Sequence, residues 1–124
     1  MAQKRIVIVD DDPHITELIC VNLDAAGYDV ARAANGREAM ERIDAARPHL
    51  IIVDVMMPEM DGWELCKTIK DDPEMDGIRI IMLTARATDR DRLIGRGIFG
   101  ADEYVTKPFD VSALMDLCER LLHE

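Results

Sequence analysis

The sequence predicts an α/β domain with a parallel sheet at its centre. Five apolar runs rich in β-branched residues alternate with segments of helical periodicity along the 124 residues. The connections between them are short, so right-handed crossovers should place helices on both faces of the sheet. The length is close to that of a common single domain, and we expect one domain over residues 1–124.

The expected strands differ in how continuously apolar they are. They are Arg5–Val9, Tyr28–Ala33, Leu50–Val53, Ile78–Leu83 and Glu103–Val105. Leu50–Val53 is apolar throughout, as is typical of a central strand buried on both faces. The run "YDVARA" alternates apolar and polar residues instead, which favours an edge strand with one face partly wet.

Helical periodicity predicts which helix faces are buried. The expected faces are Ile15, Leu18, Ile19, Asn22 and Ala26 in the first helix, Ala39 and Ile43 in the second, Leu65, Cys66 and Ile69 in the third, and Leu114, Leu117, Cys118 and Leu121 in the last. Asp12, Asn35 and Asp110 stand where N-caps should lie, and Pro13 suits a first helical position. A further helix is expected at 89–97, where Gly95 and Gly97 should leave it short, kinked or mobile.

Composition and charge exclude several classes of protein. With 15 basic and 25 acidic residues the net charge is -10, which disfavours direct binding to nucleic acid and favours a protein partner. The sequence has neither a signal peptide nor an apolar run of about 20 residues, so we expect a cytoplasmic protein that does not contact the membrane. Its three cysteines are widely spaced and should be small core side chains.

Chemically capable side chains follow four of the five predicted strands. They are Asp10 and Asp11 after the first strand, Asp54 after the third, Thr84 after the fourth and Lys107 after the fifth. The predicted edge strand ends in "AAN" and offers no charge. Because ligands bind beyond the carboxyl ends of parallel strands, these side chains should converge.

Such a cluster indicates phosphoryl transfer. Carboxylates about 4 Å apart repel by roughly 1 to 4 kcal/mol near a protein surface, so the cluster should either hold a cation or contain a carboxyl group with a raised pKa. Its oxygen ligands suit Mg²⁺. Lys107 and Thr84 could then contact phosphoryl oxygens. Each residue alone also has a structural explanation: Asp12 is better explained as a helix cap than as a ligand, Lys107 could be a surface lysine, and Asp54 could open a turn.

At these residues the sequence resembles the receiver domain of two-component response regulators. The segments "IVIVDDDP", "LIIVDVMMPEMDGWEL", "IIMLTA" and "GADEYVTKPF" carry the resemblance, which extends over essentially the whole chain. It implies a doubly wound, five-stranded parallel sheet in the order 2-1-3-4-5 with five helices, the flavodoxin-like or CheY-like arrangement.

The resemblance also implies a role for each residue at the predicted site. Asp54 matches the aspartate that accepts a phosphoryl group from the phosphohistidine of a histidine kinase. Asp11, Asp54 and the backbone carbonyl of Met56 would bind Mg²⁺ directly, with Asp10 acting largely through water.

Further matched residues concern the response to phosphorylation. Lys107 matches the lysine that contacts phosphoryl oxygens, and Thr84 and Tyr104 match the switch pair, whose side chains reorient. Pro108 matches a proline that is usually preceded by a cis peptide bond. The implied output surface comprises the fourth helix, fifth strand and fifth helix.

The resemblance further implies partners and the absence of an external substrate. The protein would catalyse only its own phosphorylation and dephosphorylation. A histidine kinase or phosphotransfer protein would supply the phosphoryl group. The output would pass to a downstream protein or to an output domain. The given sequence ends at "LCERLLHE", just after the predicted last helix, and we expect either a stand-alone receiver or a part of a longer regulator.

Other functions remain as alternatives. The "DDD" after the first strand also resembles the motif of haloacid-dehalogenase-like Mg²⁺-dependent phosphatases with an aspartate nucleophile, but the downstream acidic pair is missing. A flavin or nucleotide binder of the same architecture would need a phosphate-cradling loop where this chain has "DDDPH". His14 and His49 are expected to be solvated or to cap backbone groups.

Overall fold

The computed structural model describes residues 3–55, 62–84 and 100–123. These contain five strands, four α-helices and a 3₁₀ turn. The strands are β1 (Arg5–Val9), β2 (Asp29–Ala33), β3 (Leu50–Asp54), β4 (Arg79–Thr84) and β5 (Glu103–Thr106). The helices are α1 (Pro13–Ala25), α2 (Gly36–Ala45), α3 (Gly62–Asp71), η1 (Pro73–Met75) and α5 (Val111–Leu122).

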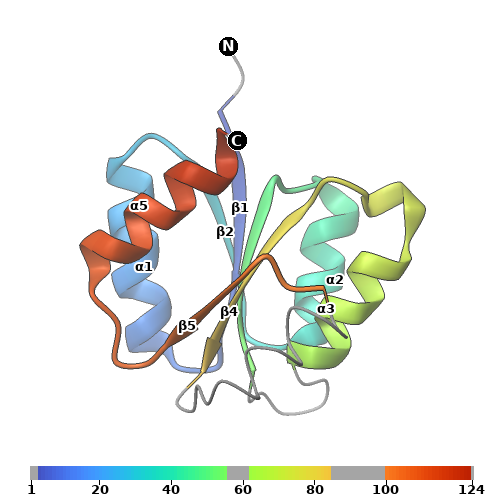
Figure 1. Ribbon diagram of the computed structural model, residues 1–124, viewed down its shortest axis with the longest axis horizontal. Helices are drawn as coiled ribbons and strands as arrows, with labels where there is room; N and C mark the ends of the chain where they lie inside the picture. Colours follow the sequence, from blue (N-terminus) through green and yellow to red (C-terminus); the bar gives the residue numbers. More distant parts are fainter. Residues whose placement is uncertain (1–2, 56–61, 85–99, 124) are drawn as a thin grey trace.

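The five strands form one parallel sheet in the order β2-β1-β3-β4-β5. Helices α1 and α5 cover one face and α2 and α3 cover the other (Figure 1). The predicted fold class and strand order are therefore confirmed. The helix predicted at 89–97, with Gly95 and Gly97, lies outside the described residues.

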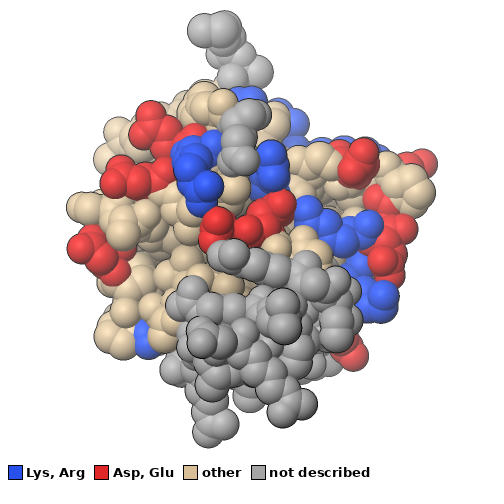
Figure 2. Space-filling view, in the orientation of Figure 1, with Lys and Arg blue, Asp and Glu red and all other residues tan. Residues whose placement is uncertain are grey.

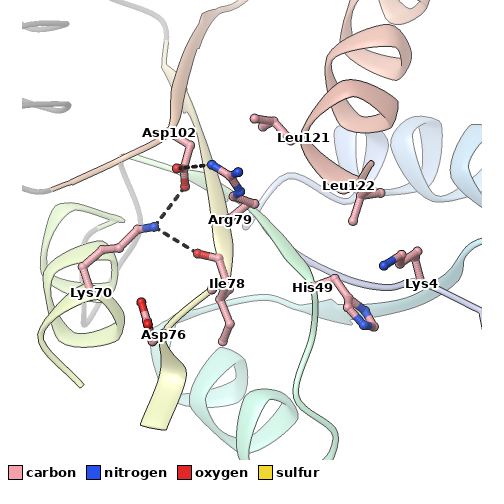
Figure 3. Close-up of a pocket in the computed structure, with 10 residues that line it drawn as sticks. Lys4, His49, Lys70, Asp76, Ile78, Arg79, Asp102, Leu121 and Leu122 are labelled. Atoms are coloured by element: carbon pink, nitrogen blue, oxygen red, sulfur yellow. Dashed lines mark hydrogen bonds and ion pairs between the residues drawn. The ribbon is translucent and has the colours of Figure 1, made fainter. Parts of the chain in front are cut away.

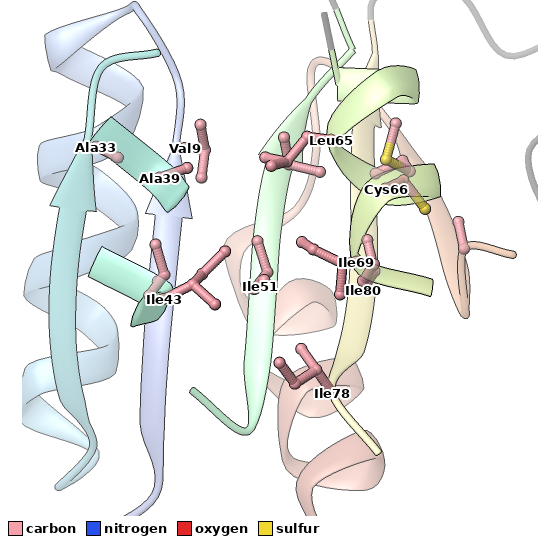
Figure 4. Packing of buried hydrophobic residues seen from close by; sticks show 14 of the residues in the cluster. Val9, Ala33, Ala39, Ile43, Ile51, Leu65, Cys66, Ile69, Ile78 and Ile80 are labelled. Carbon is pink, nitrogen blue, oxygen red and sulfur yellow. The ribbon is translucent and has the colours of Figure 1, made fainter. Parts of the chain in front are cut away.

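Alternation along the strands divides the core into two layers. In β3, Ile51 and Val53 face α2 and α3, whereas Leu50 and Ile52 face α1 and α5. Every residue of β3 is buried, as expected for the central strand. Figure 4 shows the layer between the sheet and helices α2 and α3, which includes Val9, Ala39, Ile43, Ile51, Leu65, Ile69 and Ile80.

Two strands begin one residue later than predicted because local turns use the preceding residue. The backbone N–H of Tyr28 donates to the Leu23 carbonyl at 3.2 Å, which closes the turn after α1. Similarly, the N–H of Ile78 donates to the Met75 carbonyl of η1 at 3.3 Å. Sheet pairing also extends the other ends of three strands, to Asp54, Thr84 and Thr106.

The predicted buried face of α1 was right at Ile15 and Ile19, which pack in the core, but wrong at Leu18 and Ala26. Thr16, Ile19, Cys20 and Leu23 are buried, whereas Leu18 is 45% exposed and Ala26 is exposed. Apolar residues surround much of this helix, so hydrophobic spacing alone did not identify the face that contacts the sheet. The buried Thr16 is satisfied because its hydroxyl donates to the Asp12 carbonyl at 3.1 Å, an interaction that hydrophobicity does not reveal.

The predicted caps and cysteine environments are confirmed. Side-chain oxygens of Asp12, Asn35 and Asp110 accept backbone N–H groups at the starts of α1, α2 and α5. Cys20, Cys66 and Cys118 are free and buried. No helix among the described residues has the length and apolar character needed to cross a bilayer.

Candidate functional site

The polar side chains predicted at the strand ends come together at one edge of the sheet. Asp10 directly follows β1, Asp54 ends β3, Thr84 ends β4 and Lys107 directly follows β5. Pairing fixes their relative positions, because Asp54 is opposite Leu83 and Thr84 is opposite Thr106. Parallel strands thus place residues that are distant in sequence at a common site.

Three carboxylates form the acidic part of this site. Asp10, Asp11 and Asp54 each present one oxygen, and these three oxygens lie within 4.8 Å of one another. Asp10 and Asp54 are buried, with 3% and 7% of their surface exposed, whereas Asp11 is exposed. The cluster therefore opens to solvent on the side of Asp11.

Lys107 supplies a positive charge between the two buried carboxylates. Its ammonium lies 3.0 Å from Asp10 Oδ2 and 3.6 Å from Asp54 Oδ2. Burial lowers the pKa of Lys107, but the hydrogen bond to Asp10 and the negative charges of Asp10 and Asp54 outweigh burial and raise it. The backbone N–H of Lys107 donates to the Thr84 carbonyl at 2.6 Å, which links the segment directly after β5 to the end of β4. The Lys107–Pro108 bond is cis, as the resemblance implied.

Asp10 is held on both oxygens. The backbone N–H of Asp12 donates to Oδ1 at 2.9 Å, and Lys107 donates to Oδ2 at 3.0 Å. Its own N–H donates to the Ala33 carbonyl at 3.1 Å. Asp10 is consequently a fixed anchor for Lys107, which the sequence did not reveal.

The charge of the cluster suits a divalent cation. Three carboxylates against one ammonium leave two negative charges uncompensated if all are ionised. Carboxylate oxygens are ligands that Mg²⁺ accepts, usually with water and substrate phosphate completing the coordination. Asp11, Asp54 and Asp10 could therefore hold such an ion, while Met56 lies outside the described residues.

Charged residues also line the side of the site toward β2, contrary to expectation. A cavity of about 310 Å³ is lined by Asp10 and Asp11 together with Arg32, Glu38 and Arg42. Arg32 lies within β2 and Glu38 and Arg42 lie in α2, so inspection of the last residues of the strand alone missed them.

Tyr104 and Thr84 are both buried, with 4% of their surface exposed. The Tyr104 ring stacks on Trp63, with ring centroids 5.7 Å apart and an interplanar angle of 22°. Trp63 is the second residue of α3, directly after Gly62. This aromatic pair was not predicted, because no sequence pattern relates α3 to β5.

A second, polar cavity of about 420 Å³ lies where the strands begin, at the end of the sheet opposite the carboxylate cluster (Figure 3). Asp102 there accepts from Lys70 at 3.0 Å, from Arg79 at 3.2 Å and from the Ile80 N–H at 2.7 Å. His49 Nδ1 accepts the Arg5 backbone N–H at 2.9 Å, a capping role as predicted, whereas His14 is exposed. Burial, followed by repulsion from Arg5 and Lys4, lowers the pKa of His49.

The chain belongs to the response regulator receiver domain family, whose sequence model matches residues 6–119. It is 40% identical over 118 residues to the DNA-binding dual master transcriptional regulator RpaA of Synechocystis sp., covering 95% of this chain and 48% of RpaA. It is 42% identical over 106 residues to the alkaline phosphatase synthesis transcriptional regulatory protein PhoP of Bacillus subtilis, covering 86% of this chain and 43% of PhoP. The chain thus spans about half the length of these relatives.

A solved structure agrees. The chemotaxis protein CheY4 of Vibrio cholerae superimposes with a TM-score of 0.90 at 33% identity, covering 97% of this chain and 99% of that one. The likeness extends over nearly the whole of both chains, and at 33% identity the two proteins are similar in sequence as well as in fold. The phosphatase and flavin-binding alternatives are not favoured by these matches.

Proposed function

We propose that this receiver accepts a phosphoryl group on Asp54 from the phosphohistidine of a histidine kinase or phosphotransfer protein. The observation that carries the proposal is the position of Asp54: its carboxylate lies within 4.8 Å of the Asp10 and Asp11 oxygens and 3.6 Å from the Lys107 ammonium. A carboxylate that lies beside a fixed ammonium, within a cluster able to hold a divalent cation, suits the transfer of a negatively charged group.

In the transfer, an ionised oxygen of Asp54 forms a bond to phosphorus as the bond from phosphorus to the histidine nitrogen breaks. The departing imidazole nitrogen takes up a proton from solvent, so the imidazole leaves neutral. Lys107 balances negative charge on the equatorial oxygens, and its hydrogen bond to Asp10 keeps it in place for this role. The Thr84 hydroxyl is assigned a hydrogen bond to a phosphoryl oxygen. Water later hydrolyses the acyl phosphate, so the only chemistry is the protein's own phosphorylation and dephosphorylation.

Mg²⁺ is the proposed cofactor. Asp11 and Asp54 would bind it directly with the Met56 carbonyl, while Asp10, whose oxygens accept from Asp12 and Lys107, would act through water. When bound, the ion would neutralise charge on the phosphoryl oxygens. It would also relieve the repulsion among the three carboxylates.

Phosphorylation is proposed to change the surface formed by the fourth helix, β5 and α5. The signal would pass from the phosphoryl group to Thr84 and then to Tyr104 on β5. The partner reading this surface would be a protein or an output domain. Figure 2 shows acidic and basic side chains interspersed on one face of the molecule, and the net charge of -10 also disfavours direct contact with nucleic acid. If the protein controls transcription as RpaA and PhoP are named to do, another domain would contact DNA.

The proposal is tested by incubating the protein with Mg²⁺ and acetyl phosphate, followed by intact mass spectrometry. One phosphoryl group should appear on the wild type and none on Asp54→Asn. Asp12→Asn is the matched control, because it removes the same charge next to the cluster while asparagine still caps α1. Labelling of Asp54→Asn equal to wild type would refute the assignment. Multiple turnovers of an external phosphomonoester would instead favour the phosphatase alternative.

A further inference from the structure

Trp63 links the backbone beside the phosphoacceptor to the buried aromatic ring of β5. Its ring stacks on Tyr104 with centroids 5.7 Å apart, a separation within the range that aromatic pairs favour. Trp63 is partly buried and packs against the same core layer that contains Tyr104. The stack therefore spans from the start of α3 to β5.

The start of α3 is in turn pressed against the acceptor. The backbone N–H of Gly62 donates to the Val55 carbonyl at 2.9 Å, directly after Asp54. A Cβ at position 62 would lie 2.4 Å from the Asp54 carbonyl oxygen, so only glycine fits there. Trp63 follows immediately, so the backbone that carries its ring is adjacent to the residue that packs on Asp54.

We infer that Trp63 is a positioning residue that holds the Tyr104 ring in its buried orientation and so sets the equilibrium of the switch. The direct contact between the two rings carries the inference, and the close approach of Gly62 to Asp54 connects that contact to the acceptor. The consequence for signalling rests on the proposed function. The contact itself does not, because it exists in the unphosphorylated chain. This route runs through α3, separately from the route through Thr84.

The contact can be tested without phosphorylation by ¹⁹F NMR of protein labelled with 3-fluorotyrosine. The chain has two tyrosines, and Tyr28 packs against the opposite core layer, where it is an internal control. Trp63→Leu should shift the Tyr104 resonance toward the value of an exposed ring and leave that of Tyr28 in place. Trp63→Phe retains an aromatic face and should cause a smaller shift. A Tyr104 resonance unchanged by Trp63→Leu would overturn the inference.

The effect on the switch can be tested with beryllofluoride, an unreactive analogue of the phosphoryl group, in the presence of Mg²⁺. Its bound fluorine resonance gives the affinity directly. Trp63→Leu should weaken binding by about two- to tenfold, the range expected for loss of one aromatic pair. In a Tyr104→Leu background the same substitution should have almost no further effect.

Equal weakening in both backgrounds would show that Trp63 acts independently of Tyr104 and would overturn the inference. Absence of beryllofluoride binding by the wild type would contradict the proposed function and the signalling role of Trp63 with it. The fluorotyrosine shifts would still decide whether Trp63 holds Tyr104. If Trp63→Leu is unstable, Trp63→Met replaces it in both experiments.

Discussion

The Lys107 ammonium lies 3.0 Å from the Asp10 carboxylate, whose side chain is fully buried and whose other oxygen accepts a backbone N–H. The same ammonium is 3.6 Å from Asp54. One cation is thus shared between an anchoring carboxylate and a carboxylate that remains more accessible. This arrangement predicts that Lys107 favours folding and phosphoryl transfer but weakens the binding of Mg²⁺.

Replacing Lys107 with methionine should destabilise the metal-free protein by roughly 1 to 3 kcal/mol, because it leaves a buried carboxylate without its partner. Mg²⁺ affinity should rise, since a competing positive charge is removed, while phosphorylation by acetyl phosphate slows. Urea unfolding in EDTA, a Mg²⁺ titration and labelling rates measure these effects. Lys67→Met is the control: Lys67 forms an exposed pair with Asp71, worth about 0.5 kcal/mol or less. Equal destabilisation by the two substitutions would contradict the prediction.

Mg²⁺ binding should depend on Asp11 but not on Asp12, although the two residues are adjacent. Asp11 belongs to the carboxylate cluster, whereas Asp12 accepts the His14 N–H as the N-cap of α1. Binding between Asp11 and Asp54 should change the fluorescence of Trp63, the only tryptophan, because α3 begins against the Asp54 backbone. Asp11→Asn should abolish most of this change up to millimolar Mg²⁺, while Asp12→Asn should preserve it. Matching titration curves for the two variants would argue against this metal site.

The fold was predictable because hydrophobic patterns dominate it. The continuous apolar run of β3 and the alternation of β2 identified the central and edge strands, and parallel topology then required the strand ends to meet. The face of α1 was predictable only in part, because its apolar residues extend around the helix and the buried Thr16 is satisfied by a local hydrogen bond.

The candidate site was predictable in its membership but not in its contacts. Each carboxylate and Lys107 could be placed at a strand end, yet no pattern indicated that Lys107 contacts Asp10 more closely than Asp54. Arg32 and Arg42, which line the cavity beside Asp10 and Asp11, were not predicted as part of the site for a similar reason. Side-chain reach across neighbouring elements depends on tertiary geometry, which sequence spacing does not contain.

Gly62→Ala should disturb the acceptor through the backbone alone. The added Cβ would lie 2.4 Å from the Asp54 carbonyl oxygen, and backbone atoms there must shift to relieve the clash. We expect a loss of about 1 to 3 kcal/mol and slower phosphorylation of Asp54.

Gly77→Ala provides the matched control for Gly62→Ala. Gly77 has a positive φ of 93°, but a Cβ there meets nothing within 4 Å. It should cost about 1 to 2 kcal/mol through backbone strain while leaving the phosphorylation rate unchanged. Slowing by Gly77→Ala as large as that by Gly62→Ala would show that general destabilisation, rather than displacement of Asp54, explains the effect.

The stability of the protein should fall as the pH decreases below about 6.5, in part because of His49. Burial, together with repulsion from Arg5 and Lys4, lowers its pKa in the folded state, so the unfolded chain takes up a proton first. The contribution of His49 is therefore complete above the pKa of the unfolded chain and is lost as the pH falls through the lower pKa of the folded state. Protonation of Nδ1 would also remove the acceptor for the Arg5 N–H.

His49→Asn should reduce the dependence of stability on pH between about 7 and 5, because an amide oxygen can accept the same N–H without titrating. Urea unfolding at several pH values measures how the free energy of unfolding depends on pH in the wild type and in His49→Asn. The two proteins have the same carboxylates, so a difference between their slopes is due to His49. His14→Asn is the control for the loss of an imidazole, because it replaces an exposed histidine in the first turn of α1. If His49→Asn also showed the wild-type slope, protonation of His49 would not be coupled to folding.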